Sequence, residues 1–126
     1  MDDRDGKIWF NGDLVEWRSA TTHVLTHTLH YGMGVFEGVR AYETPDGPAI
    51  FRLQDHTKRL FNSAKIVGMQ LPFTEEQINR AHIDVVKANN LASCYFRPMA
   101  YYGSGKLGVA PKQDDVQVIL AAWAWG

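Results

Sequence analysis

Short apolar runs separated by turn residues fill the first part of the chain. Residues 8–10 (Ile-Trp-Phe) and 14–17 (Leu-Val-Glu-Trp) flank Asn11-Gly12. An Asn-Gly pair between apolar runs predicts a β-hairpin with a two-residue turn. Residues 19–31 are rich in threonine and histidine, and they fit either a short helix or an ordered loop.

A second pair of strands is predicted next. Residues 35–43 are rich in β-branched and aromatic side chains, which is typical of a strand, and residues 49–52 (Ala-Ile-Phe-Arg) fit its partner. The turn between them reads Thr-Pro-Asp-Gly over residues 44–47. Proline presets φ and glycine tolerates positive φ, so this turn has a physical basis.

Two helices are predicted in the middle of the chain. Over residues 54–67 the apolar positions recur with helical spacing, and Gly68 fits the residue that follows a helix end. Thr74 and Gln77 have the spacing of a capping box, which predicts the start of a second helix reaching residues 89–90. The buried face of the first helix should comprise Leu60, Phe61, Ala64 and Val67.

The last third reads as two strands joined by a glycine-rich loop at residues 103–111. In a strand over residues 93–102, alternation places Tyr95, Arg97, Met99 and Tyr101 on one face. Pro98 on the other face indicates an edge strand or a bulge, because proline cannot donate to a ladder. With a final strand at 116–123, the pattern predicts an α+β fold: a mostly antiparallel sheet with two helices packed on one face.

Composition narrows the class of protein. The chain has 126 residues, 45% of them hydrophobic, and a net charge of −1, which fits one globular domain. Basic residues do not cluster, so nothing indicates a nucleic-acid or membrane partner. Cys94 is the single cysteine, and the N-terminal residues have no apolar signal segment. We therefore expect a cytoplasmic protein.

Two motifs suggest metal or nucleotide chemistry but support it weakly. His23, His27 and His30 would share one face if their segment were helical, yet no HExxH motif is present, and structural hydrogen bonds are the better explanation. Residues 103–108 include Gly-Lys, but the next residue is Leu107 rather than serine or threonine. We expect neither a metal site nor a nucleotide-binding loop.

Two arginines have alternative explanations. Arg59 lies four residues after Asp55, so it fits a surface ion pair, which the residues alone favour, or an anion site that uses its guanidinium fork. Arg97 shares a strand face with Tyr95. That face fits a carboxylate contact and a surface pair equally well.

Residues 30–40 read His-Tyr-Gly-Met-Gly-Val-Phe-Glu-Gly-Val-Arg. They resemble the HYGxxVFEGxR signature of branched-chain aminotransferases, which belong to the fold-type IV family of pyridoxal-phosphate (PLP) enzymes. Further matches in family order cover residues 8–12, 51–64, 95–98, 108–109 and 125–126. The resemblance implies the small N-terminal domain of that family over residues 1–122, with an interdomain linker starting at 123–126.

The resemblance also implies roles for residues near the signature. Arg59 matches the arginine that binds the PLP phosphate, which favours the anion site over the surface pair. Phe36 and Tyr95 match walls of the substrate pocket, with the Tyr95 hydroxyl near the α-carboxylate. Gly38 matches a position where a side chain would crowd the pocket. Arg97 matches a residue that receives the side-chain carboxylate of glutamate.

A further group of matched residues implies an oligomer. Tyr31 matches a second group for the glutamate side chain, and in relatives it reaches the site of a neighbouring subunit, as does the loop at Leu107 and Val109. This implies a homodimer or a higher oligomer. Trp125 matches an aromatic residue near the interdomain loop.

The implied reaction transfers an amino group between leucine, isoleucine or valine and 2-oxoglutarate. In relatives the lysine that binds PLP lies in a large C-terminal domain, and none of the six lysines of this chain matches it. This chain alone is therefore expected to be inactive. The alternatives are a D-amino-acid aminotransferase, an aminodeoxychorismate lyase, or a non-catalytic dimerisation or binding module.

Overall fold

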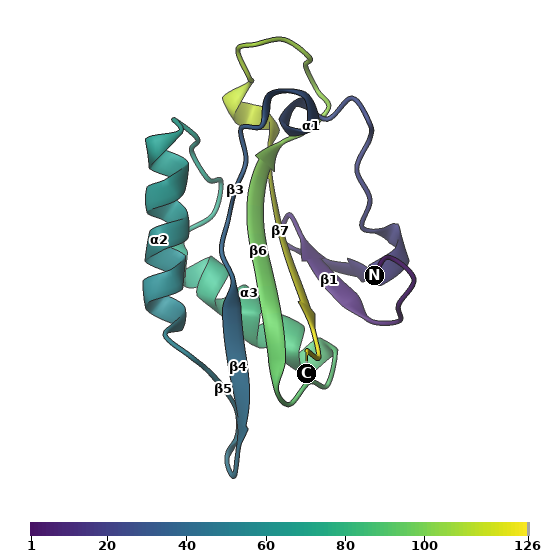
Figure 1. The fold of residues 1–126 in the computed structure, drawn as a ribbon, viewed down its shortest axis with the longest axis vertical. Coiled ribbons are helices and arrows are strands. Elements are labelled where there is room, and N and C mark those ends of the chain that lie inside the picture. The colour runs from purple at the N-terminus through teal and green to yellow at the C-terminus, as the bar shows by residue number, and fades with distance from the viewer. Residues whose placement is uncertain (126) are drawn as a thin grey trace.

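The computed structural model describes residues 1–125 and places a twisted antiparallel sheet against two long helices (Figure 1). The strands pair in the order β2-β1-β7-β6-β4-β5, and β3 pairs with β6. In chain order the elements are β1 (Lys7–Phe10), β2 (Asp13–Glu16), the 3₁₀ helix η1 (Trp17–Ser19), α1 (His27–Tyr31), β3 (Val35–Phe36), β4 (Val39–Thr44), β5 (Gly47–Ile50), α2 (Leu53–Ile66), α3 (Glu75–Ala88), β6 (Cys94–Tyr102), the 3₁₀ helix η2 (Gln113–Asp115) and β7 (Val116–Trp123).

Both predicted hairpins form. Asn11 and Gly12 adopt φ values of 51° and 100°, so the first turn uses the left-handed backbone that an Asn-Gly pair favours. Strands β4 and β5 pair up to Thr44 opposite Gly47, and Gly47 has a φ of 105°. The return strand ends at Ile50, because Arg52 turns into the left-handed region and caps α2.

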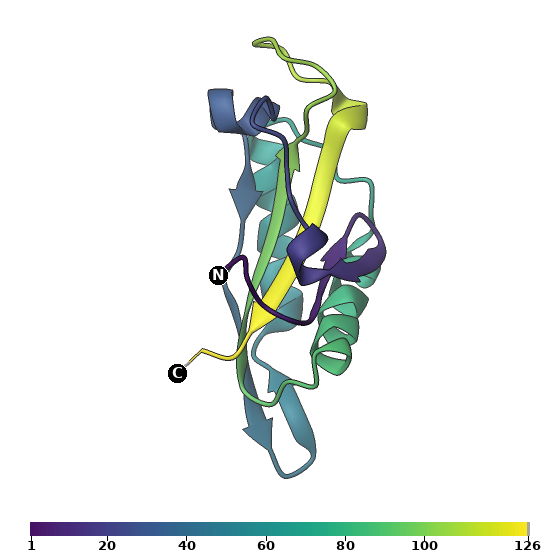
Figure 2. The same cartoon turned by 90° about the vertical axis from the view of Figure 1, so that its right-hand side faces the viewer.

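The two predicted helices are confirmed, and both lie on one face of the sheet (Figure 2). Helix α2 ends before Gly68, whose φ of 74° fits the predicted position after the helix end. Helix α3 begins with the complete capping box of Thr74 and Gln77. The core between helices and sheet includes Leu60, Ala64, Ile78, Ala81, Val85 and Phe96.

Buried and half-buried side chains alternate along most of β6 and all of β7, which separates two faces of the sheet. On the helix side, Phe96, Ala100, Val118 and Leu120 are at most 2% exposed. The intervening side chains Tyr95, Arg97 and Met99 on β6, and those from Gln117 to Trp123 on β7, are half-buried and form what we call the open face. Tyr101, at the end of the same face, is buried. This confirms the predicted alternation over residues 93–102, and the open face is the one that carries Arg97.

The position predicted for Pro98 is wrong. Strand β6 is central, since it pairs with β7 on one side and with β3 and β4 on the other. Strands β3 and β4 share one register against β6, which places Glu37 opposite Pro98. Glu37 donates its N–H to the Pro98 carbonyl at 3.0 Å, but proline has no N–H to return. The strand predicted over residues 35–43 is therefore interrupted into two.

The segment at residues 19–31 is both loop and helix. Ser19 ends the 3₁₀ helix η1, residues 27–31 form α1, and Gly32, whose φ is 71°, follows the helix end. Trp123 is the last residue of β7, one residue into the predicted linker, and Gly126 of that linker lies outside the described residues. Among residues 1–125, no helix is long and apolar enough to cross a membrane.

Candidate functional site

The three histidines of the 19–31 segment make structural hydrogen bonds. The ring of His27 is fully buried and bonds through Nε2 to the Gly108 carbonyl at 2.6 Å. His30 bonds to the Val24 carbonyl at 2.8 Å, and His23 accepts the N–H of Leu25 at 3.0 Å. No group of three potential metal-binding side chains gathers within residues 1–125.

Arg59 does not pair with Asp55, so the surface ion pair favoured by the residues alone is wrong. Asp55 instead accepts from Arg52 at 2.8 Å. Arg59, on α2, reaches over the sheet edge and donates through Nε and Nη2 to the two carboxylate oxygens of Glu37, with the Nη2 bond at 2.9 Å. Helix α2 thus places Arg59 against the strand segment of residues 35–44, which we call the signature strand because it begins within the signature at residues 30–40.

Glu37 is the buried half of this pair. Its side chain is 6% exposed, whereas the Arg59 side chain is 67% exposed. The hydrogen bond and the charge of Glu37 raise the pKa of Arg59 above its ordinary value. His56, one turn earlier on α2, places Nδ1 3.7 Å from the same carboxylate. A surface depression lined by Arg52, Asp55, His56 and Arg59 lies beside the pair.

A second cluster lies on the open face around Arg97. Its Nη2 donates to the Tyr95 hydroxyl at 2.9 Å, and its guanidinium lies 4.3 Å from the centre of the Phe36 ring. Its Nε is buried and has no hydrogen-bond partner within the described residues. The open face therefore combines aromatic surface with a cation that retains an unused donor.

Gly38 allows this cluster to form. The shared register of β3 and β4 places Gly38 opposite Arg97 on β6. A Cβ at position 38 would lie 2.3 Å from the Tyr95 hydroxyl oxygen, which is closer than any real contact. Glycine thus lets the tyrosine lie flat over the strand and reach Arg97.

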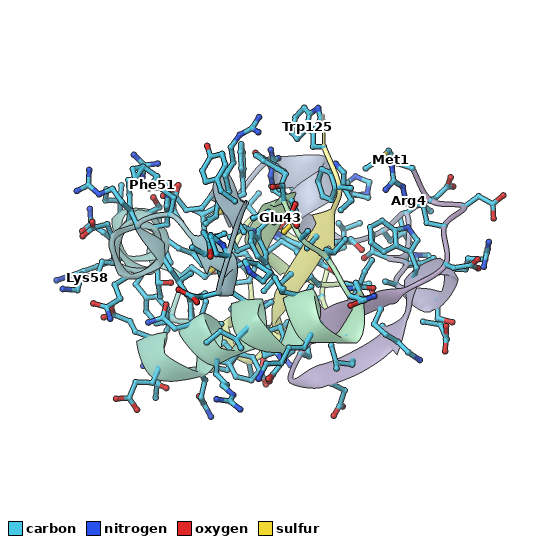
Figure 3. All side chains as sticks on the ribbon, turned by 90° about the horizontal axis from the view of Figure 1, so that it is seen from below. Met1, Arg4, Glu43, Phe51, Lys58 and Trp125 are labelled. Carbon is cyan, nitrogen blue, oxygen red and sulfur yellow. The ribbon has the colours of Figure 1, made fainter. Side chains whose placement is uncertain are left out.

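Aromatic rings enclose the other side of Tyr95. The Trp125 ring centre is 4.5 Å from that of Tyr95 at an interplanar angle of 83°, and Trp123 is at 5.3 Å. Arg40 lies 5.6 Å from the Trp125 ring. Figure 3 shows Trp125 on the side of the sheet opposite α3. The structure therefore brings Phe36, Gly38, Tyr95, Arg97 and Trp125 together.

Three other predicted residues lie apart from this cluster. Tyr31 is on α1, and Leu107 and Val109 are on the loop after β6, which His27 ties to α1 through Gly108. They are 42%, 49% and 78% exposed, respectively. Between β1, α1 and β6 there is also an apolar hollow, lined in part by Leu29, which includes none of the predicted residues.

Sequence reasoning gave no role to Glu37, Arg40 or Trp123. One signal was available for Glu37: in a strand whose odd positions Val35 and Val39 point inward, alternation also turns Glu37 inward. A buried carboxylate requires a cationic partner. Identifying Arg59 as that partner needs the position of α2, which the strand pattern does not contain.

The donor groups fit two anions of different kinds. Arg59 binds Glu37 with two of its five N–H groups, so three are free at an exposed edge, which suits a phosphate. On the open face, Arg97 and the Tyr95 hydroxyl suit a carboxylate beside apolar rings. The two sites meet at residues 36–38, where successive positions face opposite sides of the sheet.

Comparisons with a family model, with known sequences and with solved structures all find aminotransferases. The family Amino-transferase class IV matches residues 34–126. The branched-chain-amino-acid aminotransferase of Pseudomonas aeruginosa is 63% identical over 126 residues, or 100% of this chain and 41% of that protein. Its namesake in Escherichia coli (strain K12) is 43% identical over 120 residues, or 94% of this chain and 39% of that protein.

Solved structures agree with the sequence relatives. The crystal structure of the T.th. branched-chain amino acid aminotransferase matches with a TM-score of 0.92 at 50% identity, covering 97% of this chain and 42% of that one. This chain therefore spans less than half the length of the relatives it matches. The predicted fold and the resemblance carried by residues 30–40 are confirmed, and the chain belongs to the amino-transferase class IV family.

Proposed function

We propose that this chain is the small N-terminal domain of a PLP-dependent branched-chain-amino-acid aminotransferase. The observation that carries the proposal is the open-face cluster, in which Arg97 and the Tyr95 hydroxyl lie against the Phe36 ring. An enzyme that alternates between a branched apolar side chain and the acidic side chain of glutamate needs both surfaces in one pocket.

Two complexes of the T.th. enzyme support this assignment. One contains N-(5'-phosphopyridoxyl)-L-glutamate, which joins a phosphopyridoxyl group to an acidic amino acid, and the other contains 4-methylvaleric acid, a branched apolar acid. Both ligands have chemical groups that match the donors of this chain. The phosphate suits Arg59, and the carboxylates suit Tyr95 and Arg97.

In the proposed mechanism, bound PLP supplies an electron sink for chemistry at the amino-acid Cα. The residues of this chain bind and orient. Arg59 holds the phosphate, and Phe36 and Trp125 exclude water from the apolar side chain. Tyr95 donates to the α-carboxylate, and Arg97 receives the second carboxylate when glutamate is the substrate.

Covalent attachment of the cofactor is assigned to another part of the full-length protein. All six lysines are solvent-facing or half-exposed, and Lys58 points away from α2 (Figure 3). None lies in the aromatic cluster on the open face. We infer that the lysine is supplied by a further domain, so that this chain contributes the phosphate anchor and the substrate wall.

A homodimer is part of the proposal. Tyr31, Leu107 and Val109 expose apolar surface at one end of the sheet, and Val24 and Leu29 beside them are 74% and 64% exposed. Contiguous apolar surface of this kind marks interaction sites. A second copy that accepted this end would gain the aromatic and aliphatic side chains as part of its pocket. A cytoplasmic location stays a prediction of the sequence.

The assignment is tested by transamination kinetics in the full-length protein that contains this chain. Wild type should transfer the amino group of leucine to 2-oxoglutarate. Arg97→Ala should lower kcat/KM for glutamate about tenfold or more, since charge-assisted bonds contribute roughly 1.5–3 kcal/mol, and lower it much less for leucine. Arg18→Ala, which removes a surface arginine paired with Asp3 and Asp5, is the matched control. Equal losses for both substrates would contradict the role of Arg97.

A further inference from the structure

The Glu37 carboxylate is held in place before any ligand binds. Its backbone N–H bonds to the Pro98 carbonyl at 3.0 Å, which fixes the residue within the sheet. Its side chain is 6% exposed and faces α2, where His56 and Arg59 both approach it. A buried carboxylate with this support has little freedom to rotate.

Arg59, in contrast to Glu37, is exposed and would be free to move without a partner. It is a long side chain, 67% exposed, on the solvent side of α2. Free arginine side chains sample many rotamers, and ordering one on ligand binding has an entropic cost. In this structure the two bonds to Glu37 already select one orientation of the guanidinium.

The geometry of the pair leaves the binding edge of Arg59 free. Glu37 engages the edge formed by Nε and Nη2. Both N–H groups of Nη1 and the second N–H of Nη2 remain, and together they form the end of the fork that binds two oxygens of one phosphate. The adjoining depression also includes His56 and the Arg52–Asp55 ion pair, so the free end of Arg59 faces a polar surface.

We propose that Glu37 is a positioning residue for phosphate binding: it holds the Arg59 guanidinium so that its free end faces the phosphate of PLP. The inference rests on the proposed function, because it takes the phosphate of that cofactor as the anion. Glu37 acts through Arg59 and does not touch the cofactor. The interrupted strand at Pro98, the buried carboxylate and the exposed arginine thus form one support for the anion site.

The negative charge of Glu37 and its positioning of Arg59 should have opposite effects on phosphate binding. A fixed carboxylate also repels a phosphate, and a Glu37 that acted only by its charge would weaken cofactor binding. Two substitutions separate these effects. Glu37→Asp keeps the charge but withdraws the carboxylate by one methylene, so it loses the two-point contact. Glu37→Gln keeps the shape and one acceptor oxygen but removes the charge.

The experiment measures the dissociation constants of PLP and of pyridoxal, which lacks the phosphate, by absorbance titration of the full-length apoenzyme. Glu37→Asp should raise the Kd of PLP about tenfold, the order expected when an arginine must be ordered on binding. Glu37→Gln should give a smaller increase. The Kd of pyridoxal should stay within about twofold of wild type in both variants.

A double-mutant cycle with Arg59→Ala identifies the route of the effect. If Glu37 acts through Arg59, Glu37→Asp should not change the Kd of PLP further once Arg59 is alanine. Asp84→Asn is the matched control, because it removes a carboxylate that pairs with a different arginine, Arg80, on helix α3. Its Kd for PLP should equal that of wild type.

The outcomes separate this inference from the proposed function. If Arg59→Ala leaves the Kd of PLP unchanged, the proposed phosphate site itself fails. If Arg59→Ala weakens PLP binding but neither Glu37 variant does, only the positioning role is overturned. It is overturned equally if Glu37→Gln binds PLP more tightly than wild type, or if pyridoxal loses as much affinity as PLP.

Discussion

The two faces of strands β6 and β7 have the same backbone but opposite chemistry. On the helix face, Phe96 and Ala100 are completely buried, and Leu120 beside them is 2% exposed. On the open face, Tyr95 and Arg97 are half-buried, and among the described residues the Arg97 Nε has no partner. One face is closed by apolar packing against α2 and α3, whereas the other keeps hydrogen-bonding capacity available.

This difference shows how one sheet can use one face for stability and the other for ligand binding. Because side chains alternate along a strand, every second residue can be selected for packing and the remainder for binding. A substitution on the helix face should therefore change the free energy of unfolding, whereas one on the open face should change ligand binding. Substitutions matched across the sheet test this directly.

The largest expected effect comes from a matched pair of phenylalanines. Phe96→Ala should lower the free energy of unfolding by about 3–5 kcal/mol, because Phe96 is fully buried and its removal leaves a cavity. Phe36→Ala, at a side chain 57% exposed on the open face, should change it by about 0.5 kcal/mol or less. Urea denaturation of both variants measures the contrast. Similar losses would show that the open face also stabilises the fold.

His82 tests the helix face through pH. Its ring is buried against Phe96, Nδ1 donates to the Ile78 carbonyl at 2.8 Å, and Nε2 is among the buried atoms without a partner in residues 1–125. Burial, with a smaller contribution from the charge of His56, lowers the pKa of His82 from 6.5 to about 4. Protonation therefore favours the unfolded chain.

Stability should fall as the pH drops from 6.5 towards 4, by about 3 kcal/mol from this residue. The measurement is the pH dependence of the urea midpoint in wild type and in His82→Gln, which lacks the titrating ring. The difference between the two curves isolates His82 from the carboxylates. Parallel curves over this range would contradict the assignment of a neutral, buried histidine.

Cys94 tests whether the helix face excludes reagents. The residue is 3% exposed at the start of β6, and burial raises the pKa of its thiol to about 11. At pH 8 its alkylation by iodoacetamide should be about a hundredfold slower than that of a free thiol, since the thiolate is the reactive form. Denaturant should restore the fast rate. Rapid alkylation of the native protein would mean that this part of the helix face opens to solvent.

Gly38→Ala addresses the open face, where we expect a loss of activity with only a small change in stability. The new Cβ would displace the Tyr95 hydroxyl and break its bond to Arg97. In the full-length protein, kcat/KM for leucine and for glutamate should fall about tenfold, with a change in unfolding free energy of about 1 kcal/mol. Adding Tyr95→Phe removes the clashing oxygen, so the double variant should lose less than the two single losses combined.

Local patterns predicted most of the fold. The Asn11-Gly12 turn, the end of α2 before Gly68 and the capping box at Thr74 each depend on residues close together in the chain. The prediction for Pro98 failed for a physical reason. Whether a proline lies in an edge strand or a central strand depends on which strands pair with its own strand, and residues close in sequence do not reveal this. Strand β6 is central, and the neighbouring strand is interrupted between β3 and β4 opposite Pro98.

The candidate site was predictable in its residue types but not in its pairings. Alternation placed Tyr95 and Arg97 together, and the signature at residues 30–40 identified the family. The spacing of Asp55 and Arg59 favoured an ion pair that does not form, because i,i+4 spacing permits a contact without requiring it. Arg59 pairs instead with Glu37, which lies 22 residues earlier in the chain.

The sequence by itself determined the elements, the two faces of each strand and the membership of an aminotransferase family. These properties follow from periodicity and from contiguous motifs, which are local. Only the tertiary structure decided that Glu37 holds Arg59 and that Gly38 admits the Tyr95 hydroxyl beside Arg97. Both depend on where α2 and β6 pack against the signature strand, and long-range packing sets those positions.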